Sequence, residues 1–76
     1  MIRVYQLKHI SAREALRLVN EAGVIPYLIN WGCNIDEKGN RLIFQLKHGG
    51  GDFPQEEEAA ARELDRFIRS IDVGTD

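Results

Sequence analysis

The stretch from Cys33 to Lys47 predicts a β-hairpin, and the rest of the chain has to be arranged around it. Its centre, Asp36–Asn40, is rich in turn formers, and Gly39 can adopt a positive φ without steric cost. After this turn, apolar residues occur at every second position: Leu42, Phe44 and Leu46. This period of two is typical of a strand with one buried face. The hairpin therefore offers an apolar surface that other elements have to cover.

A first amphipathic helix is predicted from Ser11 to about Ala22. The Ser11 hydroxyl can accept a hydrogen bond from the amide of Glu14, and the Glu14 carboxylate can reach back to the amide of Ser11. Apolar residues then recur every three or four positions, which is typical of a helix that covers a core. Gly23 suits the left-handed residue that ends such a helix.

A second amphipathic helix is predicted near the end of the chain. Asp52 is expected to cap it, with Gln55 reciprocating, and Pro54 is tolerated in a first turn. The acidic run Glu56–Glu58 suits a solvated helix start, near the positive end of the helix dipole. The helix is expected to end near Ile71.

Two further strands are predicted before the hairpin turn. Met1–Lys8 is rich in strand formers, but its apolar residues fall on both parities, so its inward face stays open. The other strand is expected at about Tyr27–Ile35, after Pro26, with a bulge or bend at Gly32.

The predicted order is strand, helix, strand, strand, helix, in a single domain that spans residues 1–76. This is an α+β, two-layer βαββα fold, a three-stranded sheet with both helices packed on one face. The expected core includes Leu42, Phe44, Leu46, Leu64, Phe67 and Ile68. The opposite face of the sheet is left uncovered, and it is the main indication of function.

Composition limits the classes of function. With 76 residues and a net charge of −2, the chain does not suit nucleic-acid binding by bulk charge. Its only cysteine, Cys33, cannot form an intramolecular disulfide and is expected to be half-buried in a strand. No apolar run is long enough to span a membrane, and no basic-then-apolar leader opens the sequence. We expect a periplasmic module if the chain is excised from a larger protein, and a cytoplasmic protein if it is the full natural chain.

No pattern of residues indicates catalysis, a metal site or a cofactor. No nucleophile–base or carboxylate pair stands out. His9 and His48 are the only histidines, and other ligands do not follow them at metal-binding spacing. Gly49–Gly51 matches no phosphate-binding pattern and is expected to be a linker. Trp31 is expected to pack in or at the rim of the core.

Three short motifs, in this order, make the chain resemble the short N-domains of bacterial secretins, the channels of type II and type III secretion and of type IV pili. They are Val4–Ala12 followed by Glu14-Ala15, the hairpin residues Asn34–Asp36 and Asn40–Ile43, and the ending Arg66–Val73. The resemblance covers nearly the whole chain. It implies a non-enzymatic, KH-like domain whose copies pack side by side in a periplasmic ring.

With both helices on one face, alternation along the last strand places Ile43, Gln45 and Lys47 on the uncovered face, with Val4 or Tyr5 of the first strand beside Ile43. The resemblance supplies a partner for this surface. This face would dock on the helical side of the next copy, with arginines as a polar rim: Arg13, Arg17, Arg62 and Arg66. Such a contact joins two different surfaces and closes into a ring. One small face gives a weak contact, so the isolated domain is expected to be mostly monomeric.

Two alternatives remain open at this stage. A ferredoxin-like domain that binds a small ligand would need a fourth strand after Ile71, where few residues follow. A KH-like domain that binds RNA would present a GXXG loop between two helices, and the sequence contains no such loop.

Overall fold

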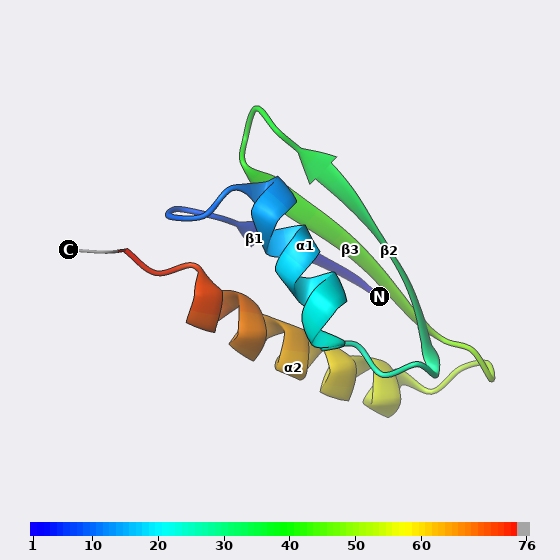
Figure 1. The fold of residues 1–76 in the computed structure, drawn as a ribbon. Coiled ribbons are helices and arrows are strands. Elements are labelled where there is room, and N and C mark those ends of the chain that lie inside the picture. Colours follow the sequence, from blue (N-terminus) through cyan, green and yellow to red (C-terminus); the bar gives the residue numbers. More distant parts are fainter. Residues whose placement is uncertain (75–76) are drawn as a thin grey trace.

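The computed structural model describes residues 1–74 and has the predicted element order. The elements are β1 (Ile2–Gln6), α1 (Ala12–Ala22), β2 (Ile29–Asp36), β3 (Arg41–His48) and α2 (Pro54–Ile71). The strands form one antiparallel sheet in the order β1-β3-β2. Both helices lie on the same side of this sheet (Figure 1). The predicted α+β fold, βαββα with one helix layer on a three-stranded sheet, is confirmed.

The hairpin of β2 and β3 differs from the prediction in two details. Pairing is continuous from Ile29 opposite His48 to Asp36 opposite Arg41, so the bulge expected at Gly32 is absent from this ladder. In the turn, the positive φ of 52° belongs to Asn40 and not to Gly39. Asparagine tolerates this left-handed conformation better than most residues, since its short polar side chain can hydrogen-bond locally.

The core lies between the sheet and the two helices. Its largest fully buried side chains come from β3, α1 and α2: Phe44, Leu42, Leu46, Leu64 and Val19. Five of the six residues expected in the core are buried. Phe67 is the exception, because its ring lies at the margin of the helix layer and is only partly covered.

Strand β1 turns the side chains of Arg3 and Tyr5 towards α2 and leaves Ile2 and Val4 exposed. The Tyr5 ring meets Phe44 edge-on, with 5.9 Å between the ring centroids, and its hydroxyl donates a hydrogen bond to Asp65. Arg3 is half-buried on the same side, and its Nε is buried with no hydrogen-bond partner among the described residues. This placement resolves the parity that the sequence leaves open.

Helix α1 begins as predicted at its cap. The Ser11 hydroxyl accepts a hydrogen bond from the Glu14 amide at 3.1 Å, and Gly23 ends the helix with φ of 61°. The Glu14 carboxylate accepts hydrogen bonds from Arg17, one turn further along, and within residues 1–74 it makes no return contact to the Ser11 amide.

Helix α2 begins differently from the prediction. Phe53 occupies the N-cap position and Pro54 the first turn, so Asp52 lies one residue too early to cap the helix. A carboxylate of the acidic run, Glu57, instead accepts a hydrogen bond from the His48 amide at 3.1 Å. It therefore ties the helix start to the end of β3.

Two side chains from distant positions fix the loop between β1 and α1. Asn40 accepts from the Ala12 amide at 2.7 Å and donates to the carbonyls of Leu7 and Ile10 at 3.3 and 2.9 Å. Asp72, just after α2, accepts from the amides of Lys8, His9 and Ile10 at 2.7–3.2 Å. The hairpin turn and the end of the last helix thus hold the same loop.

Candidate interaction surface

The sheet face opposite the helices is uncovered and is built from alternate residues of all three strands. We call it the open face. It comprises Ile2, Val4 and Gln6 of β1, Arg41, Ile43, Gln45 and Lys47 of β3, and Asn30, Gly32, Asn34 and Asp36 of β2.

An apolar patch lies on the β1 side of the open face. Val4 and Ile43 are direct partners across the sheet, and Ile2 is the next exposed residue of β1. The side chain of Ile2 is 63% exposed and that of Val4 56%. The structure therefore brings together Val4 and Ile43, as expected, and adds Ile2. Ile2 could have been predicted from the sequence, because it lies two positions from Val4 and so faces the same side of the strand.

Tyr5 does not belong to the open face. Its side chain points to the helix side of the sheet, opposite to that of Val4, and lies under α2. There burial, followed by the hydrogen bond to Asp65, raises the pKa of its phenol well above the usual value. Of the two residues expected beside Ile43, only Val4 is there. The Tyr5 hydroxyl is used within the fold.

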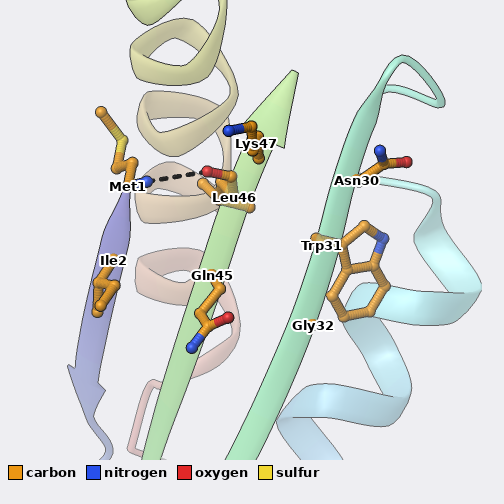
Figure 2. Close-up of a pocket in the computed structure, with 8 residues that line it drawn as sticks. All are labelled: Met1, Ile2, Asn30, Trp31, Gly32, Gln45, Leu46 and Lys47. Atoms are coloured by element: carbon orange, nitrogen blue, oxygen red, sulfur yellow. Dashed lines mark hydrogen bonds between the residues drawn. The ribbon is translucent and has the colours of Figure 1, made fainter. Parts of the chain in front are cut away.

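The open face is hollowed next to the patch, towards the end of the sheet away from the hairpin turn (Figure 2). The depression encloses about 540 Å³ and is lined by residues of all three strands and the N-terminus: Met1, Ile2, Asn30, Trp31, Gly32, Gln45, Leu46 and Lys47. Gly32 has no side chain, and a Cβ there would meet no atom within 4 Å. The missing side chain thus accounts for the hollow beside Gln45, its partner on β3.

The polar residues of the open face have two different environments. At the turn end, Asp36 and Arg41 form an ion pair with an N–O distance of 2.6 Å, and the pKa of Asp36 is lowered by the Arg41 hydrogen bond. At the other end, the open face carries Gln45 and Lys47, both exposed. The face as a whole is an apolar patch beside a hollow, bordered by polar groups.

The four arginines expected at the helical rim are exposed, and each has an acidic partner in its own chain. The pairs are Arg13 with Glu37, Arg17 with Glu14 and Glu21, Arg62 with Glu58, and Arg66 with Glu63. An arginine of this set would have to exchange or share its partner to contact another copy. Exposed pairs of this kind are worth about 0–1 kcal/mol, so an exchange costs little.

The remaining polar and aromatic candidates have local roles. The ring of Trp31 packs against Phe44 with 5.7 Å between centroids, in agreement with the expected core contact. Burial raises the pKa of the Cys33 thiol, which favours its protonated, less reactive form. The imidazole of His48 stacks on Phe53 at 4.5 Å, and its Nδ1 accepts from the Gly50 amide.

Within residues 1–74, no group of three or more histidine, cysteine, aspartate or glutamate side chains is arranged to hold a metal ion. In the same part of the chain, neither helix is long and apolar enough to cross a membrane. No family model, curated protein or solved structure matches the chain. The candidate surface therefore rests on geometry and on the sequence resemblance.

Proposed function

We propose that this chain is a non-enzymatic structural module that packs against copies of itself, or against neighbouring domains, in a ring-shaped secretion or pilus assembly. The observation that carries the proposal is the open face. Ile2, Val4 and Ile43 form a contiguous apolar patch on a face that no element of the described chain covers. Apolar patches of this kind, rimmed by polar groups, are typical of protein–protein contacts.

The proposed contact is head-to-tail. The open face of one copy docks on the helical side of the next, where exposed arginines supply the polar rim. Because the two surfaces differ, successive copies make the same contact and the series closes into a ring if the rotation allows it. The resemblance to secretin N-domains supports this geometry. It also supports a periplasmic setting, where tethering to the rest of the assembly raises the effective concentration.

The hollow beside the patch adds shape to the contact. It can receive one protruding side chain from the docked surface without any rearrangement of the sheet, because Gly32 leaves the space open. Filling the hollow from within, by Gly32→Val, should therefore weaken docking while it leaves the fold intact.

The test is Ile43→Asp in the assembly that contains this module. Tyr27→Asp is the matched control, since Tyr27 is 91% exposed in the loop before β2, outside the open face and both helices, and the charge change is the same. Ring assembly is measured by sedimentation velocity and electron microscopy, and folding by circular dichroism. We expect assembly to fall with Ile43→Asp only. Unchanged assembly with both variants folded would show that the open face is not the docking surface.

The two alternative functions have less support. A ferredoxin-like ligand-binding domain would need a fourth strand, and residues 72–74, which follow the end of α2 at Ile71, do not form one. An RNA-binding KH-like domain would need the GXXG loop that the sequence lacks, and the open face carries no aromatic side chain of the kind that stacks on bases.

A further inference from the structure

Strand β2 lies at an edge of the sheet, and the ladder shows which of its backbone groups are free. Met1 and Leu46 exchange two backbone hydrogen bonds, at 3.0 and 2.8 Å. The N–H and C=O groups of Leu46 therefore point towards β1, and by alternation so do those of Phe44 and Leu42. The alternate residues of β3, including Gln45 and Ile43, therefore bond to β2. Their partners on β2 are Gly32 and Asn34.

It follows that Trp31, Cys33 and Ile35 point their N–H and C=O groups away from the sheet. No backbone partner within residues 1–74 is recorded for these groups. Two residues before Trp31, the N–H of Ile29 also points away from the sheet, but it donates to the carbonyl of Pro26 at 3.0 Å. The free edge thus runs from Trp31 to Ile35 and is centred on Cys33.

This edge lacks most of the features that natural proteins use to prevent edge-to-edge pairing. Its one charged residue, Asp36, lies beyond the free segment and is ion-paired with Arg41. Strand β2 has eight residues, no proline, no bulge and no lysine or arginine. The opposite edge, β1, is only five residues long and turns the charged Arg3 inwards. Short edges and inward charges both oppose pairing, so β2 is the edge that is prepared for a partner strand.

We propose that the partner is a second copy of this chain, paired β2 to β2 in antiparallel orientation about a two-fold axis. The axis passes through the centre of the free edge, so Cys33 lies opposite Cys33 of the second copy. This register satisfies the free groups of all three edge residues in both copies. The two sheets then form one continuous six-stranded sheet, with all helices on the same side.

The side chains of β2 are complementary to themselves in this register. On the helix side, Trp31 lies opposite Ile35 of the second copy, so the two half-buried apolar rows extend both cores. On the open side, Asn30 lies opposite Asp36, and Gly32 opposite Asn34. No like charges face each other directly, which would destabilise a cross-strand pair.

The contact is small. The paired segment is about 20 Å long, and the buried area falls below the roughly 1,600 Å² of a standard interface. The dimer is therefore expected mainly above about 100 µM, or at lower concentration when copies are tethered. It uses a different surface from the head-to-tail contact of the open face, so either can exist without the other.

The experiment uses Cys33 as a reporter. In a hydrogen-bonded antiparallel pair the two Cα atoms are about 5.5 Å apart, within the range that a disulfide spans. Diamide oxidises the two thiols and takes up both hydrogens as the S–S bond forms. The control is the double variant Cys33→Ser, Gln45→Cys, which carries an exposed thiol on the open face. We expect several-fold more covalent dimer from the wild type, and equal yields or less would overturn the proposal.

A second measurement tests the register without changing the free segment from Trp31 to Ile35, which includes the reporter Cys33. Asn30 is exposed, so Asn30→Asp and Asn30→Lys are both expected to fold. In the proposed dimer each copy then places the new charge opposite Asp36. Sedimentation equilibrium should show a dissociation constant several-fold higher for Asn30→Asp and lower for Asn30→Lys. Ile43→Asp should leave it unchanged. The reverse order for Asn30, or a loss with Ile43→Asp, would refute edge pairing in this register.

Discussion

Substitution of Asn40 tests a side chain that holds three backbone groups of the loop between β1 and α1. Its amide makes three hydrogen bonds, to the Ala12 amide and to the carbonyls of Leu7 and Ile10, and its backbone has φ of 52°. Asn40→Gly keeps the backbone conformation and removes the three bonds. At about 1 kcal/mol each, the expected loss is about 2–4 kcal/mol.

This loss is large for a domain of this size, whose total stability is expected to be about 4–11 kcal/mol. Asn40→Ala should lose a further 1–2 kcal/mol or so, since alanine is strained at positive φ. Asn40→Asp is a near-isosteric control. It still accepts from Ala12, but its second oxygen faces the carbonyls of Leu7 and Ile10, so we expect it to be destabilised as well.

The assay is urea unfolding followed by circular dichroism, with thermal melts as a second measure. A loss of 2–4 kcal/mol corresponds to a Tm roughly 8–32 °C lower. If Asn40→Gly stays within about 0.5 kcal/mol of the wild type, the three bonds do not hold the loop and the reasoning is wrong.

Three further predictions concern stability. Leu64→Ala should lower the free energy of unfolding by about 2–5 kcal/mol, measured with urea. The loss should exceed that of Phe67→Ala, because Leu64 is fully buried and Phe67 is not, and the reverse order would contradict the core described above. Tyr5→Phe should cost about 1–2 kcal/mol in the same assay, because it removes the hydroxyl that donates to Asp65; no loss would show that this bond adds nothing. Burial raises the pKa of Asp72, but its three backbone donors outweigh burial, and the net pKa is below the usual value. Its contribution should be complete above the unfolded pKa of about 3.9 and be lost as the pH falls through the lower folded pKa. Asp72→Asn should therefore be less stable at pH 7 and lose less stability than the wild type between about pH 5 and pH 2; parallel pH profiles would contradict this.

The elements predicted correctly are those whose signals are local. Helix α1 follows from a cap at Ser11 and a stop at Gly23, both within one turn of the residues they act on. Strand β3 follows from strict alternation, because it is the central strand and has one face under the helices. The open face follows from the same alternation, which places Ile43, Gln45 and Lys47 together.

The features that sequence reasoning missed depend on distant partners. The inward face of β1 is decided by α2, where Asp65 accepts a hydrogen bond from the Tyr5 hydroxyl, so Tyr5 does not lie on the open face as one of the two expected candidates. Asn40 and Asp72 look like ordinary turn and helix-end residues. Their partners lie 28–33 and 62–64 positions away along the chain, so no local pattern marks them.

The bonds from Asp72 to the loop after β1 also bear on local opening of the molecule. The last turn of a helix usually frays by itself, at little free-energy cost. Here fraying of the end of α2 would withdraw the acceptor from the amides of Lys8, His9 and Ile10. Hydrogen exchange at these three amides should therefore report the opening of a helix end more than sixty positions away, as one cooperative event.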